Sequence, residues 1–70
     1  MQDTDRFFDG EEVQAIWWPE TGEIKVGRDC EKITVVMETG QMAGVHWFAV
    51  WNDHKITRKY NGALVEGVEL

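Results

Sequence analysis

Few side chains in this sequence are able to do nucleophilic or metal chemistry: Cys30, His46 and His54. A Cys–His pair is the usual arrangement of a thiol nucleophile, because the imidazole takes the proton from the thiol. Cys30, however, lies between Asp29 and Glu31, and two carboxylates disfavour the thiolate that would attack a substrate. The chain contains no serine, which excludes a Ser-His-Asp triad. The sequence therefore predicts no nucleophilic catalysis.

Metal, phosphate and acid–base sites match the sequence no better. A zinc site needs about four Cys or His ligands, and one Cys with two His falls short of that number. Gly40 and Gly44 are not followed by Lys-Ser/Thr, and the spacing of a glycine-rich nucleotide loop is absent. The paired carboxylates Glu11 and Glu12 lie in a stretch that we expect to be solvated, with nothing to desolvate them for catalysis. We therefore expect no enzyme, no metal and no cofactor.

The scaffold available to any site is small, with 70 residues and a mass of 8.1 kDa, which predicts one domain over residues 1–70. Chains of this size bury only about 60% of the surface that the unfolded chain exposes. Four Trp, three Phe and one Tyr still indicate a folded protein rather than a disordered acidic tail. A lone cysteine favours a reducing, cytoplasmic setting. We see neither a basic leader nor an apolar run of about 20 residues, so we expect no membrane association.

Turn signals divide the chain into short runs that are rich in β-branched and aromatic residues. Turns every 8–12 residues or so predict an antiparallel meander. The expected fold class is all-β, either a single sheet or a small SH3-like, partly open barrel of five to six strands. The expected strands are 12–18, 23–27, 32–38, 43–52, 55–60 and 63–69.

Residues 10–18 fit two local structures. Asp9 and Glu12 have the spacing of a capping box, which would start a short N-terminal helix that ends before Pro19. The bulky β-formers of 16–18, followed by Pro-Glu-Thr-Gly at 19–22, instead predict two strands around a tight turn. We expect the hairpin and keep the helix as the alternative.

The strongest pattern is a hairpin of residues 45–51 and 55–60. Placing Trp51 opposite Ile56 puts Trp47 opposite Tyr60, and the resulting aromatic ladder stabilises such a pair. If the connection around residues 39–41 has an odd number of residues, the alternating apolar residues of 33–37 join the same face. The predicted core face is then Ile33, Val35, Met37, Val45, Trp47, Trp51, Ile56 and Tyr60.

The opposite face of strand 45–51 is also apolar and carries His46, Phe48 and Val50. One interpretation is that a second layer covers this face, either the N-terminal hairpin or the closure of a small barrel. The other interpretation is an exposed patch that a partner buries. Both remain open from the sequence.

Trp18 and the C-terminal run pose the same choice between structure and binding. If Trp17 points inward, Trp18 points outward beside an acidic loop, either as a binding anchor or as a cap on the end of the sheet. Residues 61–70 begin with Asn-Gly, a hairpin-type turn, and predict a last strand that pairs back into the sheet. Left unpaired, that strand would offer an edge for dimerisation or for strand addition.

Charge is concentrated near the N-terminus. The net charge is −6, the isoelectric point is about 4.7, and residues 1–23 hold seven acidic side chains against Arg6 alone. Such a field repels nucleic acid and steers the chain toward a protein with a basic, partly apolar surface. The simpler alternative is that the acids keep a small protein soluble. The residues that we expect to contact a partner are Asp3, Asp5, Asp9, Glu11, Glu12, Trp18, Glu20, His46, Phe48 and Val50.

With no reactive constellation, the expected function is that of a non-catalytic protein-binding module. It would act as a small acidic inhibitor that mimics nucleic acid and blocks the basic groove of a nucleic-acid-handling protein. In length, acidity and lack of catalytic motifs, the chain resembles small phage-encoded inhibitors of host nucleases and polymerases, anti-CRISPR proteins among them. That resemblance is one of composition and is carried by no motif. The alternative is a structural or assembly subunit, such as a homodimer or a decoration protein, that acts by self-association.

Overall fold

A computed structural model describes residues 7–18, 22–37 and 46–70 of the chain. Over these residues the protein is mainly β, as predicted, and residues 12–18 are extended rather than helical. None of the described segments forms a helix able to cross a bilayer. The elements are β1 (Glu12–Val13), β2 (Ala15–Trp18), β3 (Gly22–Lys25), β4 (Lys32–Met37), β5 (His46–Asn52), β6 (Lys55–Asn61), the 3-10 helix η3 (Gly62–Leu64) and β7 (Gly67–Glu69).

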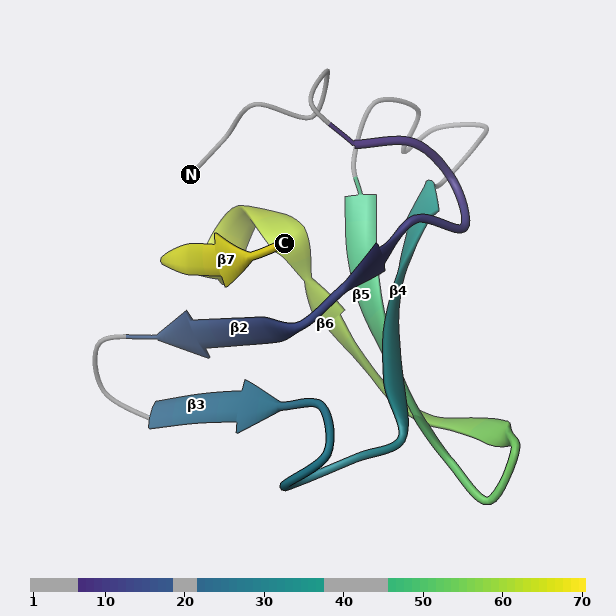
Figure 1. Ribbon diagram of the computed structural model, residues 1–70. Helices are drawn as coiled ribbons and strands as arrows, with labels where there is room; N and C mark the ends of the chain where they lie inside the picture. Colours follow the sequence, from purple (N-terminus) through teal and green to yellow (C-terminus); the bar gives the residue numbers. More distant parts are fainter. Residues whose placement is uncertain (1–6, 19–21, 38–45) are drawn as a thin grey trace.

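The strands form two antiparallel sheets, one of order β1-β4-β5-β6 and one of order β3-β2-β7. In Figure 1 the strands of the three-stranded sheet run across those of the four-stranded sheet. The segment β1–β2 passes from one sheet to the other at Gln14, whose N–H donates to the Glu69 carbonyl and whose carbonyl accepts from the Val26 N–H. The result is a pair of sheets with open edges and no closed barrel.

The crossing at Gln14 reverses the predicted faces of the two neighbouring tryptophans. In an uninterrupted strand, residues two apart share a face, which would put Trp17 inside. The break shifts this alternation, so that Ile16 is fully buried and Trp18 packs against the core, while Trp17 is 36% exposed. The prediction that Trp17 points inward and Trp18 outward is therefore wrong.

The core lies between the two sheets and takes its side chains from both. β4 and β5 pair Ile33 with Val50 and Val35 with Phe48, so these four side chains share the inner face. All four are buried. The complete buried cluster is Phe7, Val13, Ile16, Cys30, Ile33, Val35, Phe48, Val50 and Val65.

The predicted core face is right for β4 and wrong for β5. Ile33 and Val35 are inside as expected, but Trp47 and Trp51 lie on the outer face of the four-stranded sheet, and Val45 lies outside the described residues. Eight residues, 38–45, separate the paired ends of the two strands. Because that number is even rather than odd, the residues opposite Ile33 and Val35 have the other parity.

The β5–β6 hairpin also departs from the predicted register along part of its length. Trp51 pairs with Ile56 as predicted, but a β-bulge next to Trp51 shifts the pairing by one residue. Tyr60 therefore lies opposite Phe48 rather than opposite Trp47. A bulge of this kind adds one unpaired residue and bends the strand, which turns Tyr60 toward the inside of the molecule.

The C-terminal run contains the 3-10 helix η3 followed by the strand β7. Asn61, with φ −64° and ψ 120°, caps η3 by accepting the Ala63 N–H on its side-chain oxygen at 2.8 Å. A two-residue Asn-Gly hairpin turn needs positive φ at both residues, so the prediction of such a turn is wrong. The prediction that the chain pairs back into a sheet is confirmed, because β7 pairs with β2.

Candidate functional site

The two sheets leave a groove between their edge strands β3 and β6. One hollow of about 540 Å³ is lined by Trp18, Ile24, Arg58, Tyr60 and Leu64. A second hollow of about 350 Å³ shares Ile24, Arg58 and Tyr60 with the first and extends toward the β5–β6 turn. Because the two hollows share these residues, they form one continuous depression, which we call the edge groove.

An aromatic pair forms the apolar wall of the edge groove. The rings of Trp18 and Tyr60 meet edge to face, with centroids 4.9 Å apart. Leu64, which is 72% exposed, and the half-buried Ile24 extend this wall. An accessible aromatic surface beside open aliphatic side chains is typical of the anchor points of protein interfaces.

Arg58 is the cation of the edge groove. Its Nη1 donates to the Tyr60 hydroxyl at 3.3 Å, and this hydrogen bond is the main cause that raises the pKa of Arg58. The ion pairs formed within the described residues all belong to Arg28, so Arg58 has no carboxylate partner among them. Since a guanidinium carries five N–H donors, Arg58 keeps donors for an incoming group.

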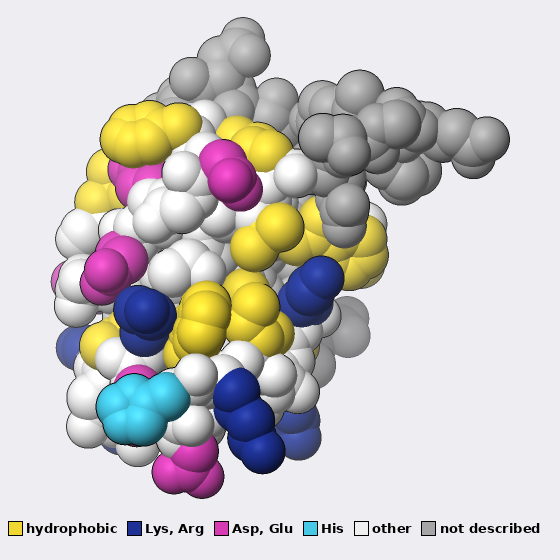
Figure 2. Space-filling view, turned by 90° about the vertical axis from the view of Figure 1, so that its right-hand side faces the viewer, with side chains coloured by type: hydrophobic (Ala, Val, Ile, Leu, Met, Phe, Trp, Pro, Cys, Tyr) yellow, Lys and Arg dark blue, Asp and Glu magenta, His cyan; other side chains and the backbone are white. Residues whose placement is uncertain are grey.

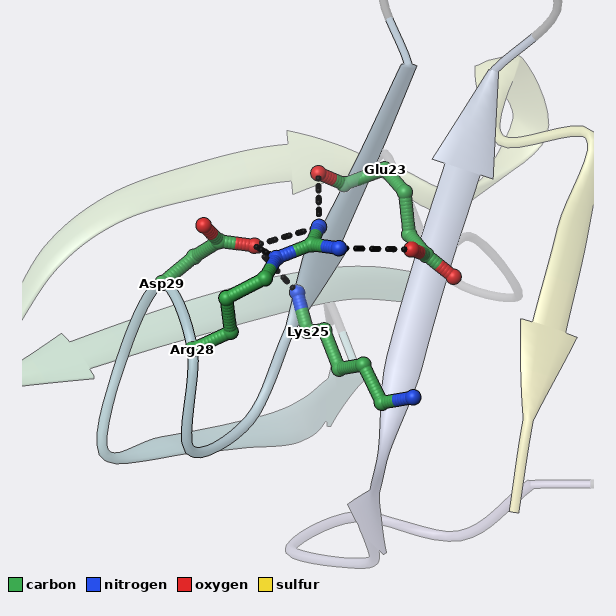
Figure 3. Close-up of polar contacts among 4 residues, drawn as sticks. All are labelled: Glu23, Lys25, Arg28 and Asp29. Carbon is green, nitrogen blue, oxygen red and sulfur yellow. Dashed lines mark hydrogen bonds and ion pairs between the residues drawn. The ribbon is translucent and has the colours of Figure 1, made fainter.

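The wall of the groove opposite β6 is held by a tight turn after β3 (Figure 3). Arg28 bridges two carboxylates, with Nη1 3.2 Å from Glu23 and Nη2 2.8 Å from Asp29. Asp29 also accepts the Lys25 backbone N–H at 2.9 Å. The bond from Arg28, and then the one from Lys25, lower the pKa of Asp29. Both acids of this wall are therefore already engaged by the turn itself.

The predicted acidic contact residues divide into three groups. Asp9 and Glu11 form hydrogen bonds with the backbone: the Asp9 carboxylate accepts the Met37 N–H at 3.1 Å, and the Glu11 carboxylate accepts the Phe8 N–H at 3.2 Å. Glu12 is exposed on β1, away from the edge groove. The acids outside the described residues are Asp3, Asp5 and Glu20. The structure thus does not gather the described acids into one site.

The predicted patch of His46, Phe48 and Val50 is wrong as a free surface, because these residues are 2%, 0% and 5% exposed. The alternative interpretation, a covering second layer, is the one that holds. Phe7 packs on both rings, with its centroid 5.4 Å from that of His46 and 5.8 Å from that of Phe48. Trp18, in the first hollow, and the buried Val50, in the second, are the predicted contact residues that line the edge groove.

The outer face of the four-stranded sheet is a second surface with aromatic side chains. Figure 2 shows hydrophobic side chains in the middle of this side, with Lys and Arg around them. Two residues of β4 fix the Trp51 side chain. Its Nε1 donates to Thr34 Oγ1 at 2.9 Å, and Lys32 Nζ lies 4.3 Å from its ring centroid. The Trp47 Nε1 is buried and has no hydrogen-bond partner among the described residues.

Sequence reasoning missed Arg58, Ile24 and Leu64 as residues of the site. The spacing of Arg58 and Tyr60, two residues apart on one strand, shows that they share a face, and the sequence placed Tyr60 on the core face. It did not show that Trp18, Ile24 and Leu64 border the same space. No pattern in the sequence predicts that Ile24 and Leu64, rather than other aliphatic residues, border a groove.

Cys30, outside the edge groove, is a free and buried cysteine. Burial raises the pKa of the Cys30 thiol, which therefore disfavours the thiolate. Among the described residues, no three His, Cys, Asp or Glu side chains come close enough to hold a metal ion.

His46 should make the stability of the fold sensitive to mild acid. Burial lowers the pKa of His46 from its usual 6.5, and its Nδ1 has no hydrogen-bond partner within the described part of the chain. As the pH falls below about 6.5, the unfolded chain takes up a proton that the folded chain resists, so the free energy of unfolding decreases. We expect the urea midpoint to drop between about pH 7.5 and pH 5.5.

The matched variants for this prediction are His46→Leu and His54→Gln. His54 is exposed, so its replacement should keep the acid-induced drop, whereas His46→Leu should reduce it. Equal pH dependence in wild type and His46→Leu would show that another group is responsible.

No family model, curated protein or solved structure matches this chain, so the edge groove is the basis on which a function is assigned.

Proposed function

We propose that this chain is a non-catalytic protein-binding module whose contact surface is the edge groove. The observation that carries the proposal is the combination of an accessible aromatic pair, Trp18 and Tyr60, with Arg58, a cation that has no carboxylate partner among the described residues. Aromatic residues and arginine are the side chains that most often dominate the energy of protein interfaces. Here they lie together in one depression.

The form of the groove favours a protein segment over a small molecule as its occupant. The groove runs between two strand edges and continues from one hollow into the next. Small-molecule sites usually enclose most of their ligand, whereas a groove along a strand edge suits an extended chain. In this proposal the protein acts by occupying its partner and performs no reaction.

The wider charge of the chain supports a partner with a basic, partly apolar surface. The net charge of −6 steers such a partner over distances of a Debye length or so. Arg58 acts only at contact, so a local cation is compatible with an acidic protein. Inhibition of a nucleic-acid-handling protein in the cytoplasm is the finer form of this proposal, and it rests on the charge and on the single cysteine.

The proposal is tested with adjacent tryptophans that lie on different faces of the same strand. A library of random short peptides is selected on the intact chain, and the selected peptides are synthesised and titrated against variants. Trp18→Ala should weaken their binding by about tenfold or more, because Trp18 forms the wall of the groove. Trp17→Ala, which removes a ring that does not line the groove, should change affinity less than about twofold.

Two results would contradict the proposal. One is a selection that yields no binding peptide, and the other is a set of peptides whose affinity Trp17→Ala reduces as much as Trp18→Ala does. Equal losses would move the contact surface away from the groove.

Self-association is the second candidate function, favoured by the open edge of β6 in the four-stranded sheet. An open strand edge can pair with the same edge of a second copy. Light scattering at micromolar concentration separates the two functions. A stable dimer that Trp18→Ala dissociates would favour assembly, and a monomer would favour a foreign partner.

A further inference from the structure

We propose that the edge groove binds its partner by strand addition. An extended partner segment pairs with the open edge of β6, packs an apolar side chain against Trp18 and places a carboxylate on Arg58. This inference rests on the proposed function above and specifies the chemistry of the occupant.

The two strands that border the groove differ in whether their edges are open. The turn after β3 closes the edge of that strand: the Lys25 N–H donates to the Asp29 side chain, and the Lys25 carbonyl accepts from the N–H groups of Arg28 and Asp29. The Glu23 carbonyl accepts from Arg28 Nη2 at 3.1 Å. Figure 3 shows the contacts of the Lys25 N–H and of the Glu23 carbonyl. Little of the β3 backbone is therefore available to a new strand.

The edge of β6 has no comparable cover. β6 ends the strand order of its sheet, with β5 as its single neighbour. Among the described residues, no backbone hydrogen bond from outside β5 reaches residues 55–60. In an antiparallel edge strand, alternate residues direct both N–H and C=O away from the sheet. The hollows lined by Arg58 and Tyr60 lie along this same strand.

The bulge confines strand addition to the second half of β6. Thr57 closes the bulge by donating its hydroxyl to the Val50 carbonyl at 3.3 Å. Beyond it the pairing with β5 is regular, from Arg58 to Asn61. Bulges and charged side chains protect an edge from indiscriminate pairing, so a partner must match the charge of β6 in order to use the edge.

The side chains along the groove define the pattern that an incoming strand needs. Arg58 and Tyr60 point to the same side of β6, and Trp18 packs against Tyr60. Residues two apart in an extended segment lie about 7 Å apart on one face. A segment with an apolar residue and an acidic residue at positions i and i+2 therefore reaches the aromatic wall and the guanidinium together.

Charge selects a carboxylate for the second position. Arg58 donates to the Tyr60 hydroxyl and has no carboxylate within 4 Å among the described residues, whereas Glu23 and Asp29 across the groove are bridged by Arg28. An incoming carboxylate can therefore take fork-shaped hydrogen bonds from Arg58 without displacing an ion pair. A lysine at the same position would meet a like charge.

The test uses the synthetic peptides selected on the intact chain. Arg58→Gln should weaken peptides of the apolar-x-acidic pattern by about fivefold or more, while Lys59→Gln, which alters the next residue on the outer face, should change affinity less than about twofold. Replacing the peptide Asp by Asn should weaken binding to wild type but not to Arg58→Gln, since the two changes remove the same contact. Peptide binding should also slow amide hydrogen exchange within residues 58–61.

The outcomes separate this inference from the proposed function. Two results overturn strand addition but remain consistent with a protein-binding module. In the first, the peptides need Trp18 but neither a carboxylate nor Arg58. In the second, peptide binding leaves amide hydrogen exchange in residues 58–61 unchanged. A chain that dimerises through this edge replaces the partner segment by a second copy and also overturns the inference. A selection that recovers no peptide contradicts both.

Discussion

Replacing Phe48 with alanine should leave most of the protein unfolded at room temperature. The Phe48 side chain is fully buried at the centre of β5, and its ring meets the rings of Phe7 and His46 with centroids 5.8 Å and 5.2 Å apart. Removing a buried aromatic ring costs about 3–5 kcal/mol through lost transfer energy and the cavity left behind. A domain of this size has little more stability than that to lose. Circular dichroism during urea denaturation measures the loss.

Trp51→Ala is the matched control, because it truncates a larger aromatic side chain on the same strand. Trp51 is only half-buried and lies on the outer face, so we expect a loss of about 1–2 kcal/mol from its packing and its bond to Thr34. Trp47, which the sequence pattern placed in the core, lies on this outer face as well. If Trp51→Ala proves as damaging as Phe48→Ala, the inner face of β5 has been assigned to the wrong residues.

Gly62→Ala should be the most harmful glycine substitution in the described chain. A Cβ at Gly62 would run into the imidazole of His46. That ring is 2% exposed and lies between Phe7 and Phe48, so it has no free space to move into. Overpacking of this kind typically costs about 1–3 kcal/mol. Thermal unfolding followed by circular dichroism would report it as a lowered midpoint.

Gly67→Ala provides the control, because its Cβ would meet the ring of Trp17. Trp17 is 36% exposed and can turn outward, so the cost should stay below about 1 kcal/mol. In a His46→Ala background the obstacle at Gly62 is gone, and Gly62→Ala should then cost far less than in wild type. Additive losses in the double variant would show that the imidazole is not what Gly62 accommodates.

Local sequence was sufficient for the type and approximate limits of the elements. The strands of 15–18 and 22–25, the strands of 32–37 and 46–52, and the pairing of Trp51 with Ile56 all follow from β-forming runs between turn residues. These features depend on neighbours within a few residues, which is the range over which propensity and turn chemistry act. The absence of a serine and the single cysteine bounded the chemistry in the same direct way.

The candidate site could be predicted only in part. Trp18 was selected from the sequence as a binding residue and does line the edge groove. Its neighbour in that groove, Arg58, is 40 residues away in the chain, and no local pattern brings Arg58 and Trp18 together. His46, Phe48 and Val50 were candidates for a surface and are core. The sequence indicated candidate site residues, but it did not indicate which residues of the other sheet they contact.

What the amino-acid sequence determined by itself is an all-β domain of short strands, rich in tryptophan and poor in reactive groups. Tertiary structure alone decided which faces of β2 and β5 are inside. A strand repeats every two residues, so the crossing at Gln14, the even connection 38–45 and the bulge beside Trp51 each exchange the buried and exposed sets. Adding or removing one residue in a connection or a strand exchanges the inner and outer faces without changing the local β propensity. Only the packing of one sheet against the other selects which of the two faces is buried.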